Sequence, residues 1–247
     1  MSALRSPLHV EIDGDGPALV LLHGGGGGAD DLAGLRDGLR EGRRIIAPDQ
    51  RAHGRSPDLG ELSYAAMAAD TAALLDELGV RAADVVGWSD GGIIGLRVAR
   101  DRPDLVGRLV AISANVSWAL PAPAAMREAS FEWLRAATAA DIEIPAGRAE
   151  LTGAVDAWPG IVDKLLAMWQ GDPGITLADL ARIDAPVLYL AGDHDVVRNE
   201  HTLAMFEATP DAQLAIIPDA DHWVAQRPLS IVVPIIERFL AGAAGPP

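Results

Sequence analysis

The chain has 247 residues, 49% of them hydrophobic, a length that fits one large α/β domain with a modest insertion. Its formal net charge of −15 at pH 7 repels a phosphate backbone and argues against a nucleic-acid partner. The absence of cysteine excludes thiol catalysis, disulfides and cysteine-ligated zinc. Because no apolar run is long enough to cross a bilayer and the first residues do not resemble a signal peptide, we expect a cytoplasmic protein with no membrane partner, and the sequence indicates no oligomeric state.

Short apolar runs alternate with amphipathic helical stretches along most of the chain. This pattern predicts an α/β fold with a doubly wound, mostly parallel sheet, its first strand antiparallel. The expected strands cover residues 8–12, 17–23, 43–48, 83–88, 107–113, 185–192 and 212–218. The expected helices cover residues 30–40, 63–78, 90–101, 199–208 and 228–241. Ser63 is placed to cap the second of these helices and Gly79 to end it.

The stretch from 116 to 182 breaks this alternation. It holds helical patterns around 122–140 and 159–170, no convincing strand, and four of the six tryptophans of the chain. We therefore expect a small helical cap at 116–182, inserted before the last two strands and facing the carboxyl ends of the strands, where such sheets bind ligands. The body then consists of residues 1–115 and 183–247.

The stretch GWSDGG places Ser89 where a predicted strand turns into a predicted helix. Gly87 and Gly91 flank the serine in the spacing Gly-x-Ser-x-Gly. Such a tight turn forces strained backbone angles on the serine, and the small flanking residues let the strand and the helix approach each other. A structural turn does not need this arrangement, whereas an exposed nucleophile does, so Ser89 is the predicted nucleophile.

A serine hydroxyl becomes a good nucleophile only when a base accepts its proton and a third group orients that base. For a serine on a strand-to-helix turn, the acid and then the histidine must follow in the chain, each just after a later strand. The stretch GDHD offers Asp193 and Asp195, and the spacing Gly-x-x-Asp favours Asp195. Of the six histidines, only His222 lies in a loop at a strand end in the required order. The sequence thus predicts a triad of Ser89, Asp195 and His222, with Asp193 as the alternative acid.

A tetrahedral intermediate also needs two preorganised N–H donors, which form an oxyanion hole. One expected donor is the backbone N–H of Asp90, at the start of the predicted helix. The other comes from the glycine loop HGGGGG at 23–28. Gly25 is the preferred donor there, and a shift of register would make it Gly24 or Gly26.

Three residues near the predicted nucleophile bear on the substrate. Trp88 and Trp118 are candidates to shape an apolar pocket for the acyl or leaving group, although Trp88 could equally pack beneath the turn. The Asp90 carboxylate either pairs with a substrate ammonium or favours the helix N-terminus, where a negative charge is worth a few tenths to about 1 kcal/mol.

Other functional classes fit parts of the same sequence. The glycine loop at 24–29 with Asp49 after the next strand loosely matches a dinucleotide-binding fingerprint, but this interpretation leaves the predicted triad unexplained. The acids and histidines at 193–195 and 221–222 could be neighbours, but no histidine pair has the spacing of a metalloprotease. We therefore expect no cofactor and no metal. A ligand receptor that retains the pocket is the non-enzymatic alternative.

Five motifs together resemble the α/β-hydrolase family: LLHG with its glycine loop, DQRAHGRS, GWSDGG, GDHD and DADHW. The resemblance covers the body and implies Ser89 as nucleophile, Asp195 as acid and His222 as base. Ala52 departs from the glycine that is usual in the second motif, which affects loop shape more than chemistry. GWSDGG and AISANVSW are also similar to the valacyclovir-hydrolase or biphenyl-hydrolase-like branch, which implies small esters.

These observations predict a serine hydrolase that cleaves a small ester-like molecule through an acyl-enzyme intermediate. The same triad also supports C–C bond hydrolysis, lactone hydrolysis and cofactor-free perhydrolysis, which the sequence does not separate.

Overall fold

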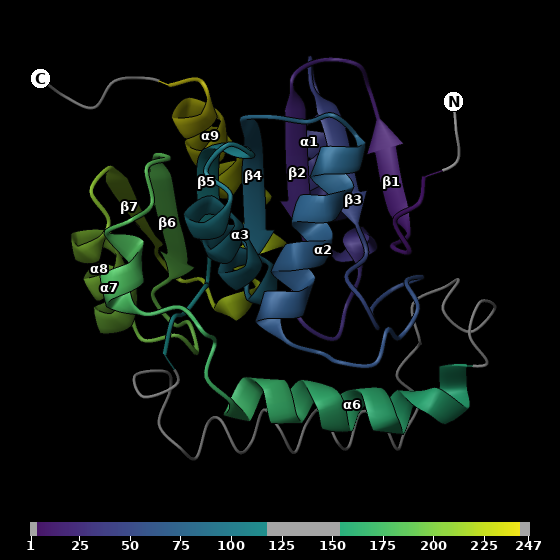
Figure 1. Cartoon of the computed structure of the whole chain (residues 1–247). Coiled ribbons are helices and arrows are strands. Elements are labelled where there is room, and N and C mark those ends of the chain that lie inside the picture. The colour runs from purple at the N-terminus through teal and green to yellow at the C-terminus, as the bar shows by residue number, and fades with distance from the viewer. Residues whose placement is uncertain (1–3, 118–153, 243–247) are drawn as a thin grey trace, which may run out of the picture.

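A computed structural model describes residues 4–117 and 154–242 (Figure 1). Seven strands form one sheet in the order β1-β3-β2-β4-β5-β6-β7. β1 pairs with β3 in the antiparallel direction, and the other neighbouring strands are parallel. The strands are β1 (Val10–Asp13), β2 (Ala18–Leu22), β3 (Arg44–Pro48), β4 (Ala83–Trp88), β5 (Val106–Ile112), β6 (Val187–Gly192) and β7 (Ala212–Ile217). The doubly wound, mostly parallel sheet with an antiparallel first strand is confirmed.

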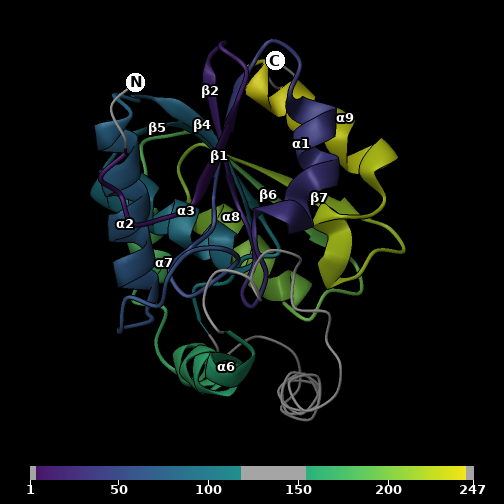
Figure 2. The ribbon, with the colours of Figure 1, turned by 90° about the vertical axis from the view of Figure 1, so that its right-hand side faces the viewer.

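Helices cover both faces of this sheet, as the view in Figure 2 shows. One face carries α1 (Ala33–Leu39), which follows the 3-10 turn η1 (Ala29–Leu32), and α9 (Leu229–Leu240). The other face carries α2 (Tyr64–Glu77), α3 (Asp90–Asp101), α7 (Leu177–Leu180) and α8 (Asn199–Ala208). Because both faces are covered, the central strands are apolar almost throughout rather than alternating.

The ends of α2 agree with the local signals in the sequence. The Ser63 side chain accepts a hydrogen bond from the backbone N–H of Ala66 at 3.2 Å, which satisfies one of the free donors at the helix N-terminus. Gly79, directly after the C-cap Leu78, has a φ of 66°, a left-handed conformation that favours glycine.

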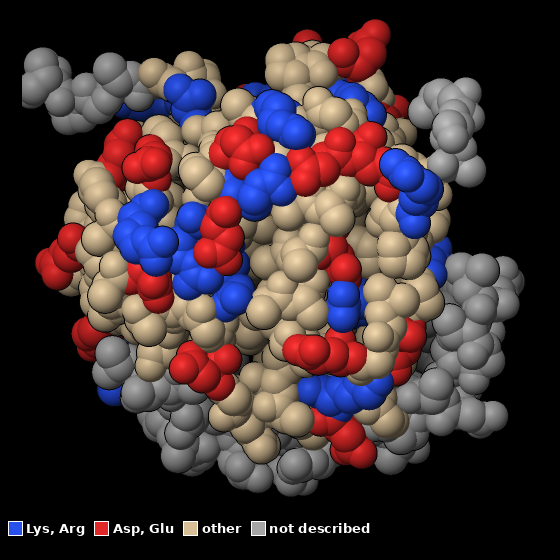
Figure 3. Space-filling model, viewed as in Figure 1, with Lys and Arg blue, Asp and Glu red and all other residues tan. Residues whose placement is uncertain are grey.

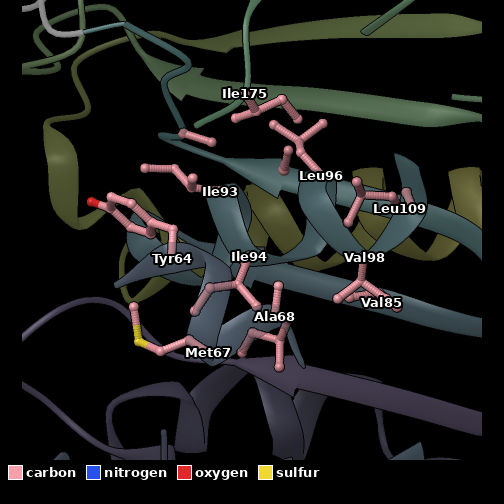
Figure 4. Packing of buried hydrophobic residues seen from close by; sticks show 14 of the residues in the cluster. Tyr64, Met67, Ala68, Val85, Ile93, Ile94, Leu96, Val98, Leu109 and Ile175 are labelled. Atoms are coloured by element: carbon pink, nitrogen blue, oxygen red, sulfur yellow. The ribbon is translucent and has the colours of Figure 1, made fainter. Parts of the chain in front are cut away.

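A buried apolar cluster fixes the helix that follows the predicted nucleophile. Ile94 of α3 lies beside Met67 and Ala68 of α2 (Figure 4). Further along α3, Leu96 and Val98 lie on the side of the cluster where Leu109 of β5 packs (Figure 4). Tyr64 is at the edge of this cluster, and its hydroxyl points away from the apolar side chains (Figure 4). The packing therefore holds α3 rigidly against the sheet and leaves one polar group facing the carboxyl ends of the strands.

Helix α6 (Ala154–Gln170) crosses below the carboxyl ends of the strands in Figure 1. It includes the predicted helical stretch 159–170, and its buried Ile161, Val162 and Leu165 join the cluster around α2 and α3. The predicted helix at 122–140 lies outside the described residues, and the boundaries of the cap at 116–182 stay a prediction. No helix in the described ranges is both long and apolar enough to span a membrane.

Basic and acidic side chains are interspersed on the face shown in Figure 3. Ion pairs occur among the described residues: Arg102 pairs with Asp76 at 2.7 Å and with Asp104 at 2.8 Å. Exposed pairs of this kind contribute little to stability. On this face, the basic side chains therefore lie beside carboxylates, including the group of basic side chains left of the centre in Figure 3.

The turn between β4 and α3 is so tight that two glycines are required by their surroundings. A Cβ on Gly87 would lie 2.2 Å from the carbonyl oxygen of Gly91, and a Cβ on Gly91 would lie 2.0 Å from that of Leu22. Both distances are far below van der Waals contact. The two glycines therefore let β4, α3 and the end of β2 meet without a steric clash.

We predict that Gly91→Ala destabilises the protein by about 3 kcal/mol or more, because the new methyl group must displace backbone. Gly160→Ala is the matched control, since a Cβ at Gly160 in α6 meets no atom within 4 Å and alanine favours a helix. Urea unfolding of both variants measures the difference. Equal stability of the two variants would contradict the steric account.

Candidate active site

Ser89 occupies the turn between β4 and α3 with φ 54° and ψ −118°. Residues other than glycine rarely adopt this region, and such strain persists only where the surroundings enforce it. The Ser89 N–H donates to the carbonyl of Ile112 at 2.8 Å, and the Ser89 carbonyl accepts from the N–H groups of Gly92 and Ile93 at 2.9 and 3.2 Å. These bonds hold the strained turn that the sequence predicts.

The structure brings Ser89, His222 and Asp195 together in one line of hydrogen bonds. His222 Nε2 lies 3.0 Å from Ser89 Oγ, and His222 Nδ1 lies 2.8 Å from Asp195 Oδ1. Asp195 follows β6, and His222 begins the 3-10 turn η2 (His222–Ala225) after β7. Asp193, the alternative acid, instead accepts a bond from the N–H of Ala220 at 3.2 Å.

Asp195 is surrounded by donors that keep it ionised. Its side chain is 0% exposed, and it accepts bonds from Ser113 Oγ at 2.5 Å and from the N–H of Val197 at 2.9 Å. Burial alone would raise the pKa of Asp195, but the hydrogen bonds that it accepts outweigh burial and hold this pKa below its usual value. Because the Asp195 carboxylate accepts a bond from Nδ1, the hydrogen on that bond is on Nδ1, and Nε2 faces the Ser89 hydroxyl.

Ser113 is a site residue that the sequence reasoning missed. It directly follows β5, so the position after a central strand was the available signal. Its hydroxyl bonds the carboxylate oxygen that His222 does not use. Ser113 therefore orients the acid in the same way that the acid orients the base.

Trp88 is buried at the end of β4, with 5% of its surface exposed. Its indole Nε1–H donates to the backbone carbonyl of His222 at 2.8 Å. Its ring lies tilted against the rings of His222 and Trp223, at centroid distances of 5.9 and 5.2 Å. A role in the substrate pocket stays a prediction for Trp88, and Trp118 lies outside the described residues.

The glycine loop lies against the turn at Ser89, as expected for an oxyanion loop. A Cβ on Gly25 would lie 2.2 Å from Asp90 Oδ2, and a Cβ on Gly24 would lie 3.0 Å from the Trp88 ring. His23 steadies this loop, because its Nδ1 bonds the carbonyl of Gly24 at 2.7 Å and its Nε2 accepts the N–H of Gln50 at 2.9 Å. The loop therefore reaches the first turn of α3, where the two predicted oxyanion donors would have to meet.

The Asp90 side chain turns into the protein and joins three elements. Its carboxylate accepts bonds from Tyr64 Oη of α2 at 2.8 Å and from Trp169 Nε1 of α6 at 2.9 Å. Burial raises the pKa of Asp90, and the two bonds only partly oppose it. Tyr64 and Trp169 were not singled out as partners of Asp90, because neither is near it in sequence.

Asp49, the acid of the dinucleotide interpretation, is fully engaged in its own loop. Its carboxylate accepts bonds from the backbone N–H groups of Ala29 at 2.7 Å and Arg55 at 2.8 Å. Burial raises the pKa of Asp49, but these bonds outweigh burial and lower it. Asp49 thus supports the polar loop rather than facing a ribose. In the part of the chain that the structure describes, no group of three or more potential metal ligands is gathered.

We predict that Ser113→Ala lowers the free energy of unfolding by about 2 kcal/mol near pH 7, because it removes a hydrogen bond to a buried carboxylate. A lowered pKa stabilises the fold only while the group is ionised, so the deficit must shrink as the pH falls below about 4. Ser56→Ala is the control, because the Ser56 hydroxyl donates to the uncharged backbone carbonyl of Asp49. Urea unfolding of both variants across this pH range tests the prediction, and a constant deficit for Ser113→Ala would contradict it.

Comparison with known proteins extends across most of the chain. The sequence profile of the Alpha/beta hydrolase family matches residues 19–234. The sn-1-specific diacylglycerol lipase ABHD11 of Mus musculus is 29% identical over 93% of this chain and 83% of its own length. The 2-hydroxymuconate semialdehyde hydrolase of Pseudomonas putida is 28% identical over 97% of this chain and 92% of its own.

Solved structures show the same fold. The meta-cleavage product hydrolase CumD from Pseudomonas fluorescens IP01 superposes with a TM-score of 0.75 at 19% identity, over 96% of this chain and 95% of that chain. A thermophilic esterase from Thermogutta terrifontis superposes with a TM-score of 0.70 at 24% identity, over 95% and 93% of the two chains. The protein is therefore an enzyme of the hydrolase type, and the chain belongs to the alpha/beta hydrolase family.

Proposed function

We propose that the protein is a serine hydrolase that cleaves small carboxylic esters through an acyl-enzyme intermediate. The observation that carries this proposal is the unbroken line of hydrogen bonds from Ser89 Oγ through His222 to the buried Asp195 carboxylate. This is the arrangement that activates a serine hydroxyl near neutral pH. A relative with the name of a lipase and a structural neighbour with the name of an esterase support the choice of an ester.

In the first half of the proposed reaction, Ser89 Oγ attacks the ester carbonyl carbon while His222 Nε2 takes the hydroxyl proton. The backbone N–H groups of Asp90 and Gly25 hold the negative oxygen of the tetrahedral intermediate. His222 then gives its proton to the leaving alcohol, and the acyl group stays on Ser89. Asp195 stabilises the imidazolium that exists between these two proton transfers.

In the second half, the same groups act on a water molecule. His222 Nε2 takes a proton from the water as it attacks the acyl carbonyl, and the oxyanion donors act again. Collapse of this second intermediate returns the proton to Ser89 Oγ and releases the carboxylic acid. The cycle consumes one ester and one water and needs no bound cofactor.

We predict that Ser89→Ala lowers kcat for p-nitrophenyl butyrate at least about a thousandfold, since removal of a triad nucleophile causes losses of this order or greater. Ser230→Ala, at an exposed serine of α9, is the matched control and should keep full activity. Steady-state kinetics of the three proteins, with circular dichroism to confirm folding, makes the test. Activity of Ser89→Ala within tenfold of wild type would refute the proposed nucleophile.

Hydrolysis of a C–C bond is the second candidate. It is favoured by the relative from Pseudomonas putida, which is named as a hydrolase of 2-hydroxymuconate semialdehyde and aligns with 97% of this chain. The same triad can serve either reaction. Measuring kcat/KM for 2-hydroxymuconate semialdehyde beside the ester separates them: a clear preference for the ester supports the first candidate, and a clear preference for the semialdehyde replaces it with the second.

Asp90 suggests a narrower substrate class within the ester proposal. Asp90 is 4% exposed and directly follows the proposed nucleophile in the chain. The two donors bonded to its carboxylate, Tyr64 and Trp169, are both uncharged. A buried carboxylate is costly without a positive partner. An ester that carries an ammonium group close to its carbonyl would provide that partner.

We predict that Asp90→Asn lowers kcat/KM for the p-nitrophenyl ester of L-valine at least about tenfold more than for the p-nitrophenyl ester of 3-methylbutyric acid, since a difference of this size is about 1.4 kcal/mol of charge pairing. The two esters differ only in the ammonium group, so any general damage to the site affects both. An equal loss for the two esters would rule out ammonium recognition by Asp90.

A further inference from the structure

We propose that Trp88 is a positioning residue for the catalytic base: its indole joins the loop that carries His222 to the strand that carries Ser89. The inference rests on the proposed function, because it assigns a role in the same triad. It concerns the indole N–H of Trp88, which is bonded to the backbone carbonyl of His222, and not the pocket role predicted for the Trp88 ring.

The first observation is the hydrogen bond from Trp88 Nε1 to the carbonyl oxygen of His222, at 2.8 Å. The two ring nitrogens of His222 are already committed to Ser89 and Asp195, which set the orientation of the ring. The position of the ring depends in addition on the main chain of η2. The Trp88 N–H fixes the carbonyl of the base itself, and Trp88 is covalently joined to the nucleophile. One side chain therefore sets the separation of the two reacting residues.

The second observation is that the same ring supports the glycine loop. A Cβ on Gly24 would lie 3.0 and 3.1 Å from Trp88 Cε3 and Cζ3, so the ring lies against the residue that precedes the predicted donor Gly25. Trp88 also contacts the indole of Trp223, at 5.2 Å between centroids. Trp88 thus directly precedes the proposed nucleophile, its indole is bonded to the backbone of the proposed base, and its ring lies against the glycine loop.

The competing account is that Trp88 only fills the core. Trp88 belongs to a buried apolar cluster on the α1 and α9 face of the sheet, and a buried indole N–H needs some acceptor in any case. Both accounts predict a loss of stability when the indole is changed. Only the positioning account predicts that catalysis falls when the ring shape is kept and the N–H alone is removed.

The size of the expected effect follows from the geometry of proton transfer. A misplacement of about 1 Å can cost about a hundredfold in rate. Loss of one anchoring bond should let the His222 main chain shift by a fraction of that distance. We therefore expect kcat to fall about tenfold while KM stays within about twofold when the N–H alone is removed, because this N–H is bonded to the protein and the shape of the ring is kept.

The experiment compares Trp88→Phe with replacement of Trp88 by 3-benzothienylalanine, which keeps the bicyclic shape and lacks the N–H donor. Tyr189→Phe is the control, because it removes one buried side-chain hydrogen bond, to Thr209 Oγ1 at 2.8 Å, without contact to the triad. For each protein we would measure thermal unfolding, kcat and KM for p-nitrophenyl butyrate, and the second-order rate of Ser89 phosphonylation by a p-nitrophenyl phosphonate.

The positioning account predicts that both Trp88 replacements lose about tenfold in kcat and in the phosphonylation rate, whereas Tyr189→Phe loses thermal stability alone. If the benzothienyl protein keeps wild-type rates, the N–H has no positioning role and the inference is overturned. A wild-type protein that the phosphonate does not label at all would instead count against the proposed function. The two failures are therefore distinguishable.

Discussion

The structure depends on one backbone constraint, the left-handed conformation of Ser89 between β4 and α3. At φ 54°, this residue is held where an L-amino acid is strained, and its hydroxyl lies 3.0 Å from His222 Nε2. The turn can close only because Gly87 and Gly91 have no Cβ to strike the neighbouring carbonyls. The packed interface of α2, α3 and the sheet keeps the turn from relaxing. Every group that acts on the serine is placed relative to this fixed point.

Two buried carboxylates near that point have opposite environments. Asp195 accepts bonds from His222, Ser113 and the backbone, and its pKa is lowered. Asp90 accepts bonds from two uncharged side chains, and burial raises its pKa. The first carboxylate therefore remains a stable negative partner for an imidazolium. The second is bonded to the uncharged side chains of Tyr64 and Trp169, and this difference underlies the proposal that the substrate carries a positive charge. Two acids whose surroundings shift their pKa values in opposite directions commonly have different roles.

The sequence allowed the sheet, its helices and the three side chains that the structure brings together at Ser89 to be predicted, because each of these leaves a local trace. Continuous apolar runs mark buried parallel strands, and a serine between glycines at a strand end marks the turn. β6 begins at Val187 rather than at residue 185, since Pro186 has no N–H for the sheet. Ala52, where glycine is usual in that loop motif, adopts a φ of 60°, so it keeps the left-handed conformation at the cost of some strain.

The contacts that orient the triad were beyond the sequence because they join residues far apart in the chain. Ser113 meets Asp195 across two neighbouring strands, and Trp169 reaches Asp90 from the α6 helix. Trp88 was noted as a neighbour of the nucleophile, but its bond to the carbonyl of His222 depends on how the η2 turn lies beside β4. No periodicity or motif encodes such pairings, since they arise only when packing fixes the separate elements.

The central claim is that Ser89 carries the acyl group during turnover. The most direct measurement is acid quenching of the first turnover with p-nitrophenyl butyrate, followed by mass spectrometry of the intact protein and of its peptides. The account predicts one butyryl group per chain, on the peptide that contains Ser89, and its absence from Ser89→Ala. Release of p-nitrophenol with no acylated peptide, or with the acyl group on another residue, would contradict it.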